Sequence, residues 1–239
     1  LRNGTDTSFL PGSDGARIDV PRNVKYVITL DSDTRLPFGA VRRLVGKMEH
    51  PLNIPEFSDP DGAVVDGHAI LQPRITASLP AEGEATLYQK LYSTGGGIDP
   101  YAGAISDVYH DLFGQGSYTG KGIYHVDLFE RSAAGHFPEN AILSHDLIEG
   151  IYARAGLASD VEFIEEFPNR YDVARSREHR WTRGDWQLLP WLFGLHAQAG
   201  KLSHLGRWKI FDNLRRSITP MASVAGVFLS LALLPGFVA

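Results

Sequence analysis

The feature that most constrains this chain is its C-terminal stretch. Residues 218–239 carry no charged side chain and are rich in Val, Leu, Ala and Phe. About 20 consecutive apolar residues span the hydrocarbon core of a bilayer, so this stretch predicts a transmembrane helix. Pro220 suits the first turn of such a helix, and Pro235-Gly236 is a place where it could end early. A buried core helix followed by a tail is the alternative.

A basic segment, residues 201–217, precedes this stretch. Its cations are Lys201, Arg207, Lys209, Arg215 and Arg216, and its single acid is Asp212. Positively charged flanks of membrane helices stay in the cytoplasm. We therefore expect a basic juxtamembrane connector here, with the preceding residues on the cytoplasmic side of a lipid bilayer.

Composition narrows the class of the remaining chain. The 239 residues are 43% hydrophobic and 21% charged, which is ordinary globular usage and excludes disordered and fibrous classes. Acids outnumber Lys and Arg by 28 to 23, whereas proteins that bind a phosphate backbone usually carry a basic excess, so no nucleic-acid partner is predicted. The absence of cysteine excludes disulfides, thiolate metal sites and a cysteine nucleophile. The N-terminal residues have no signal-peptide pattern and read like the middle of a larger multidomain chain.

Alternating strand and helix patterns predict an α/β domain with a mostly parallel sheet over residues 1–200. The β-branched and aromatic run at residues 24–30 predicts a buried strand, and the apolar spacing after Pro37 predicts an amphipathic helix. Further strands are expected within residues 63–75 and 161–166, and further helices over residues 84–92, 126–132, 147–155 and 173–192.

Asp31 and Asp33 follow the first predicted strand directly. In open α/β sheets, ligands bind at the carboxyl ends of the strands, so both carboxylates are expected to project into that crevice. Two carboxylates one residue apart can face Mg²⁺ or Mn²⁺ and bridge it to substrate phosphates. The alternative is a solvated turn, but the position at a strand end favours a functional pair.

Two enzyme classes use an Asp-x-Asp pair in this position. Phosphotransferases of the haloacid-dehalogenase type have Asp-x-Asp-x-Thr, but here the fifth position is Arg35 and the Thr falls one place early, at Thr34. Nucleotide-sugar glycosyltransferases use the metal held by the carboxylates to neutralise the leaving diphosphate. A non-catalytic domain that binds glycan or acts as a membrane scaffold is a third possibility.

Asp146 is the second candidate, at the start of a predicted helix. In a purely structural interpretation, Ser144 or Asp146 caps that helix. In a functional one, Asp146 is a general base that takes a proton from a sugar hydroxyl. His145 and Glu149 lie nearby, but their spacing differs from that of a two-His zinc helix, so no zinc site is predicted.

A third group lies on one face of the helix predicted over residues 173–192. Helical spacing brings together Arg177, Arg180, Trp181 and Gly184. Arginine forks donate two hydrogen bonds to phosphate oxygens, and an indole offers an apolar plane to a sugar ring. The apolar run at residues 186–193 predicts an amphipathic helix in the membrane interface, with a helix packed on the core as the alternative.

In this order, the three motifs resemble those of the family 2-type processive glycosyltransferases: Asp-x-Asp, a Thr-Glu-Asp-like motif and Gln-x-x-Arg-Trp. Two positions depart from the pattern, because Ser-His replaces Thr-Glu and Arg177 replaces the Gln. The Ile-Leu-Ser-His-Asp form is similar to that of the osmoregulated periplasmic glucan glucosyltransferases. The whole ensemble resembles the glycosyltransferase module of the cyclic β-1,2-glucan synthases. The segments that carry this resemblance are residues 30–35, 70–74, 119–124, 137–140 and 180–187.

The resemblance implies a GT-A-like (Rossmann-like) domain whose first nucleotide-binding strand precedes Leu1. It implies a membrane-bound inverting transferase that uses UDP-glucose to extend a β-1,2-glucan acceptor, at the cytoplasmic side of the bacterial inner membrane. Asp31 and Asp33 would hold Mg²⁺ or Mn²⁺ and the diphosphate of the donor. Asp146 would deprotonate the acceptor hydroxyl.

The resemblance also implies roles for the remaining candidates. Arg177, Arg180 and Trp181 would bind the diphosphate and the acceptor sugar. Gly120 and Lys121 would line the acceptor channel, and Lys121 could add positive charge near the leaving group. The residues predicted to support this site from around it are Gln72, Arg74, His145 and Glu149.

Overall fold

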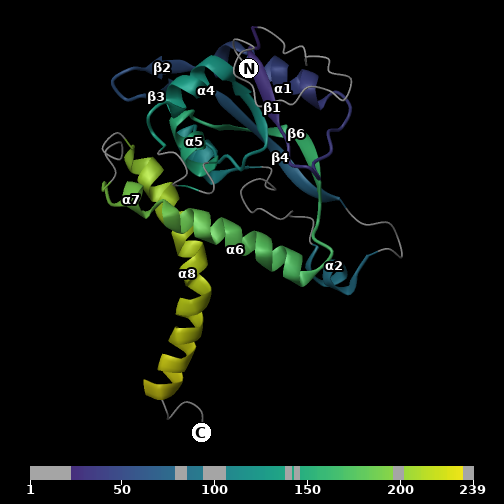
Figure 1. Ribbon diagram of the computed structural model, residues 1–239, viewed down its shortest axis with the longest axis vertical. Helices are drawn as coiled ribbons and strands as arrows, with labels where there is room; N and C mark the ends of the chain where they lie inside the picture. The colour runs from purple at the N-terminus through teal and green to yellow at the C-terminus, as the bar shows by residue number, and fades with distance from the viewer. Residues whose placement is uncertain are drawn as a thin grey trace, which may run out of the picture.

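The computed structural model of the chain describes residues 23–78, 85–93, 106–137, 142, 146–195 and 202–233. Within these, an α/β domain sits at one end of the long helix α8 (His204–Leu233), which projects away from it (Figure 1). The N-terminal residues 1–22 and the Pro235-Gly236 pair lie outside the described residues, as do Ser144 and His145.

Within the described residues, four strands form the central sheet of the domain. In spatial order they are β1 (Tyr26–Thr29), β5 (Gly122–His125), β4 (Ile70–Ser78) and β6 (Gly156–Glu166). β4 and β6 run parallel, whereas β5 runs antiparallel to both of its neighbours. The α/β class is therefore confirmed, but the sheet is mixed and not mostly parallel. Residue patterns mark strands without giving their direction, which is set by the connections between them.

One face of the sheet is covered by α1 (Ala40–Met48), the helix expected after Pro37. Its buried residues Ala40, Leu44 and Met48 pack against the sheet residues Leu71, Ile123 and Phe163. Because α1 carries its apolar side chains at helical spacing, it buries one stripe and leaves the other exposed. A 3₁₀ turn (Pro51–Asn53) and a hairpin of β2 (Glu56–Ser58) and β3 (Ala63–Asp66) follow it.

The other helices are α2 (Leu87–Tyr92), α3 (Val108–Phe113), α4 (Val126–Ala133), α5 (Asp146–Tyr152), α6 (Tyr171–Gln187) and α7 (Leu189–Leu192). A second core joins α5, α7 and the first half of α8 through Ile148, Leu188, Trp191 and Ile210. Leu188 and Trp191 belong to the apolar run that predicted an interface helix, so part of this run is core. Phe193, at its end, is exposed.

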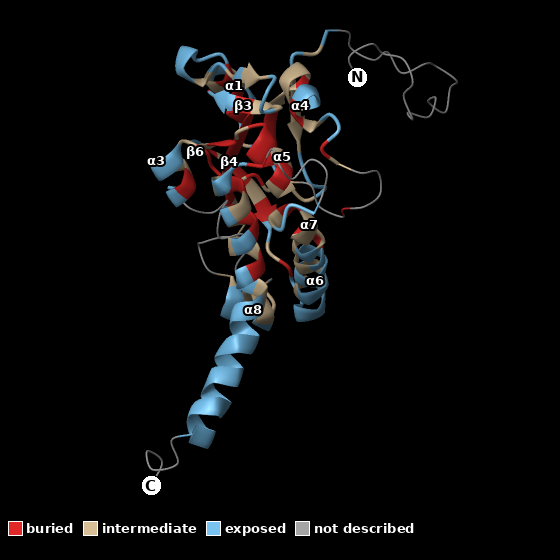
Figure 2. Ribbon diagram, turned by 90° about the vertical axis from the view of Figure 1, so that its left-hand side faces the viewer, coloured by how far each residue is buried: buried red, intermediate tan, exposed pale blue. Residues whose placement is uncertain are grey.

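α8 is continuous from the basic connector into the apolar stretch. Pro220 therefore lies inside this helix. The prediction that it occupies the first turn was wrong. A proline within a helix removes one backbone donor, and nearby hydroxyls bond to backbone carbonyls here: Thr219 Oγ1 donates to Arg215 O at 2.7 Å and Ser223 Oγ to Thr219 O at 2.8 Å. By length and composition α8 can cross a membrane, and its C-terminal half is exposed (Figure 2).

Candidate functional site

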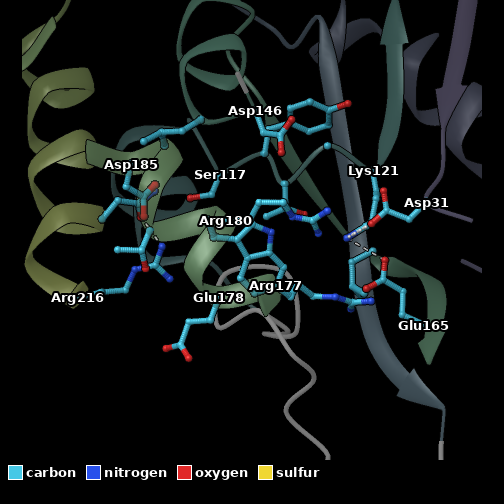
Figure 3. A pocket seen from close by; sticks show the side chains of 18 of the residues that line it. Asp31, Ser117, Lys121, Asp146, Glu165, Arg177, Glu178, Arg180, Asp185 and Arg216 are labelled. Carbon is cyan, nitrogen blue, oxygen red and sulfur yellow. Dashed lines mark hydrogen bonds and ion pairs between the residues drawn. The ribbon is translucent and has the colours of Figure 1, made fainter. Parts of the chain in front are cut away.

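A cavity of about 810 Å³ lies between the sheet, α5, α6 and the first half of α8 (Figure 3). Residues from all three predicted motifs line it. They are Asp31, Gly120, Lys121, Asp146, Arg177, Arg180 and Trp181. The fold therefore brings candidates that are far apart in the sequence to one place.

Three carboxylates meet at one end of this cavity, and two of them, Asp31 and Glu165, line it. Asp31, Asp33 and Glu165 each offer an oxygen, and these oxygens all lie within 4.8 Å of one another. Asp31 and Asp33 come from the turn after β1. That turn is fixed to β6 by backbone hydrogen bonds, in which Arg35 N donates to Ile164 O at 2.7 Å and Ile164 N to Arg35 O at 3.0 Å. The next residue along β6, Glu165, is thereby placed beside the aspartates.

Glu165 is the residue that the sequence interpretation missed. It is only 3% exposed, and Thr34 Oγ1 donates to its Oε1 at 3.2 Å. The predicted strand over residues 161–166 ends in Glu165-Glu166, and the rule that ligands bind at the carboxyl ends of strands could have identified it. Three carboxylates form a hard oxygen donor set, which fits Mg²⁺ or Mn²⁺.

Two cationic side chains contact this carboxylate triad. Lys121 Nζ lies 3.1 Å from Asp31 Oδ2 and 2.9 Å from Glu165 Oε1, and its side chain is 11% exposed. Burial works against the charge on Lys121, but the hydrogen bond and the charge of Glu165 outweigh it, so the pKa of Lys121 is raised above 10.5. Arg177 Nη2 lies 3.3 Å from Asp33 Oδ2. The triad is thus paired with positive charge from a loop and from α6.

Asp146 is the first residue of α5 and lines the cavity beside Gly120 (Figure 3). Gly120 has a φ of +84°, and a Cβ at Gly120 would lie 3.0 Å from Asp146 Oδ2. A left-handed residue without a Cβ is what allows this close approach. The first turn of a helix also favours a carboxylate electrostatically, and Asp146 lines the cavity from this position.

Glu149 lies one turn further along α5 and does not line the cavity. Burial raises the pKa of Glu149, and the charge of Asp146 adds to this effect, bringing it to about 7. Glu149 therefore lies outside the cavity lining, and the charge on Asp146, the candidate base, makes it harder for Glu149 to lose its proton. His145, predicted to support the same place, lies outside the described residues.

The two candidates on β4 make different contacts. Gln72 is fully buried, and its Oε1 accepts hydrogen bonds from Thr119 N at 3.0 Å and Thr119 Oγ1 at 3.2 Å. It thereby fixes the residue that precedes Gly120. Arg74 points elsewhere: it does not line the cavity, and its Nη2 lies 3.5 Å from Glu162 Oε2. Arg74 therefore contacts β6, next to the register shift that follows Pro73 in the pairing of β4 with β6, and its supporting role stays a prediction.

α6 forms the opposite wall. Arg180 and Trp181 line the cavity, and Trp181 keeps 39% of its surface exposed there. Asp185, further along α6, accepts a hydrogen bond from Asn213 Nδ2 of α8 at 3.3 Å. The helix that carries the arginines is therefore attached to the helix that continues into the apolar stretch.

Lys209 of α8 is a buried cation that the sequence interpretation saw only as a basic flank. Its Nζ donates to Gln115 O at 2.8 Å and to Gly116 O at 2.7 Å, and it lies 5.2 Å from the ring centre of Tyr109. These carbonyls begin the loop that leads to Gly120 and Lys121. The base of α8 thus holds the loop that forms one side of the cavity.

Comparison with known proteins agrees with the resemblance noted from the motifs. Over 225 residues, 94% of its length, the chain is 53% identical to the cyclic beta-(1,2)-glucan synthase NdvB of Rhizobium meliloti (strain 1021). The chain spans 8% of the length of that relative. No family model matches the chain. The predicted resemblance to a cyclic glucan synthase module is confirmed by this identity.

Proposed function

We propose that this chain, a segment homologous to part of a cyclic β-1,2-glucan synthase, is the catalytic part of a membrane-bound inverting glucosyltransferase. It uses UDP-glucose to extend a β-glucan, with a β-1,2 linkage in keeping with the name of its relative. The observation that carries the proposal is the convergence of the carboxylate triad, Lys121, Asp146 and Arg180 on one cavity.

The triad end of the cavity binds the donor. Asp31, Asp33 and Glu165 would hold Mg²⁺ or Mn²⁺, which when bound would supply positive charge to neutralise the leaving diphosphate. Arg177 and Lys121 already lie beside these carboxylates and add positive charge close to the same place. Arginine can donate two hydrogen bonds to phosphate oxygens, which suits Arg177 and Arg180 to fixing the diphosphate.

Asp146 faces the acceptor. Its carboxylate takes the proton of an acceptor hydroxyl, while that oxygen forms a bond to the anomeric carbon of glucose. The bond from this carbon to the diphosphate breaks, and the electron pair leaves with UDP. Because the acceptor enters opposite the leaving group, the α-linked donor gives a β-linked product. Trp181, partly exposed in the cavity, offers its indole face to the acceptor sugar.

α8 attaches this domain to a membrane. Its C-terminal half is apolar and exposed, and the basic residues 201–217 favour a cytoplasmic position for the catalytic domain at the bacterial inner membrane. This chain spans 8% of the length of its relative. The proposal therefore includes a larger multidomain chain, of which this domain is one part.

The test is transfer of radiolabelled glucose from UDP-glucose in membranes that contain the full-length synthase carrying this chain. We expect incorporation into polymer that EDTA stops and that added Mg²⁺ or Mn²⁺ restores, with β-1,2 linkages on analysis of the product. Asp160→Asn, at an exposed acid that pairs with Arg43 away from the cavity, is the control for loss of an acid elsewhere in the chain. It should leave incorporation unchanged. No incorporation by a folded, inserted protein would contradict the proposal. Phosphate release from a phosphoester without a sugar acceptor would favour a phosphotransferase instead.

A further inference from the structure

The Lys121 ammonium lies among the carboxylates that are proposed to bind a metal ion. Its ammonium contacts Asp31 at 3.1 Å and Glu165 at 2.9 Å, which are two of the three carboxylates in the triad. The third, Asp33, is paired with Arg177 at 3.3 Å. Each carboxylate of the triad therefore already has a protein cation beside it.

This pairing bears on how a divalent cation could enter. Three carboxylates with one ammonium and one guanidinium leave a single net negative charge in the cluster. A divalent ion bound by the triad would lie close to the Lys121 ammonium on the side of the buried Glu165, where like charges repel more strongly than at the exposed Asp31. The ammonium of Lys121, in the position it has in this structure, therefore weakens the binding of a divalent cation to the triad.

The Lys121 ammonium can also reach partners inside the cavity. Lysine carries a compact charge on a flexible four-carbon stem, so its head can change partners without a change in the backbone. The side chain lines the cavity and is flanked by Gly120 and Gly122. A diphosphate in that cavity would present the ammonium with anionic oxygens as new partners.

We propose that the Lys121 ammonium holds the place of the divalent cation in the nucleotide-free site. A nucleoside diphosphate draws the ammonium off Asp31 and Glu165 and so releases these carboxylates to the metal. Metal and nucleotide consequently bind with positive coupling, which by linkage acts equally on both affinities. This inference rests on the proposed function, because it needs a diphosphate in this cavity.

The experiment measures Mn²⁺ binding to the full-length synthase by the loss of the free Mn²⁺ signal in electron paramagnetic resonance, with and without UDP. Binding that Asp33→Asn abolishes is assigned to the triad. In the wild-type protein, we expect UDP to raise the Mn²⁺ affinity about tenfold or more. Lys121→Gln should bind Mn²⁺ about tenfold more tightly than wild type without UDP, and UDP should raise its Mn²⁺ affinity by a smaller factor than in wild type.

Two control variants separate the role of the ammonium from a general effect of losing a lysine. Lys121→Arg keeps a cation and should retain the weak, UDP-dependent binding of the wild type. Lys47→Gln removes a lysine that pairs with Asp160 outside the cavity and should change nothing. A thermal unfolding transition shows that each variant is folded.

Three results would count against the inference. An Mn²⁺ affinity in Lys121→Gln equal to or weaker than that of wild type overturns it, while UDP-dependent Mn²⁺ binding in the wild type leaves the proposed function standing. If Lys121→Gln does not fold, the test rests on the wild-type protein. Equal Mn²⁺ affinity of the wild type with and without UDP overturns the proposed coupling. Absence of any triad-dependent Mn²⁺ binding, in the presence of UDP, overturns the metal-dependent function as well.

Discussion

The backbone of Gly120 lies against the carboxylate of Asp146, so closely that a Cβ at Gly120 would come within 3.0 Å of Asp146 Oδ2. The next residue, Lys121, reaches Asp31 and Glu165 at the other end of the cavity. One short turn therefore touches both the candidate base and the carboxylate triad. The position of this turn sets the distance between the two chemical functions of the site.

Replacing Gly120 by Ala should impair transfer without preventing folding. The φ of +84° is unfavourable for Ala, and the new methyl group would push on the Asp146 carboxylate. Misplacement of a catalytic group by about 1 Å can lower the rate about 100-fold, and we expect a loss approaching that size in kcat. Steady-state transfer kinetics measure it. Gly46→Ala, where a Cβ would meet nothing within 4 Å, is the control, and full activity of Gly120→Ala would show that the contact does not matter.

Glu149 should make stability depend on pH. Its pKa is raised from 4.5 to about 7, by burial first and by Asp146 second, so the folded state holds this proton more tightly than the unfolded state does. As pH rises through this window the folded state loses stability relative to the unfolded state, by about 1–3 kcal/mol in all. Glu149→Gln removes the penalty. Its melting temperature should exceed that of wild type more at pH 8 than at pH 5, and an equal difference at both values would contradict this.

Lys209 should stabilise the loop that precedes Gly120. Lys209→Met removes the donor from two buried backbone carbonyls, those of Gln115 and Gly116. Leaving such groups unpaired costs about 1–3 kcal/mol each, which lowers the melting temperature by several degrees. Lys47→Met breaks only an exposed pair and should change it little. Thermal unfolding compares the two variants, and an equal effect would show that the carbonyl contacts contribute nothing.

Part of the site could be predicted because the signal is local. Asp31 and Asp33 follow a strand that the residues of β1 mark clearly, and Asp146 begins a helix whose apolar spacing is regular. Such patterns depend only on neighbouring residues, so they can be read without knowing the fold. The same holds for the helical face of Arg177 and Arg180.

Other parts depend on contacts that no local pattern records. Glu165 joins the aspartates only because Arg35 and Ile164 form a bridge between the turn after β1 and β6. β5 runs antiparallel to its neighbours, although nothing in its own residues gives its direction. Pro220 was expected at a helix start, but the helix already begins at His204, because Ile210 and Leu214 pack into the core with α5 and α7.

The measurement that tests the central claim most directly is the turnover and UDP affinity of Asp146→Asn in the full-length synthase. Asn preserves the shape of the side chain but cannot take the acceptor proton, so we expect transfer to fall by about 10²–10⁴-fold while UDP affinity is unchanged. Asp59→Asn, at an exposed acid paired with Arg131, serves as the matched control. Wild-type turnover in Asp146→Asn would contradict the assignment of Asp146 as the base, and with it the account of this cavity as a glucosyltransferase site.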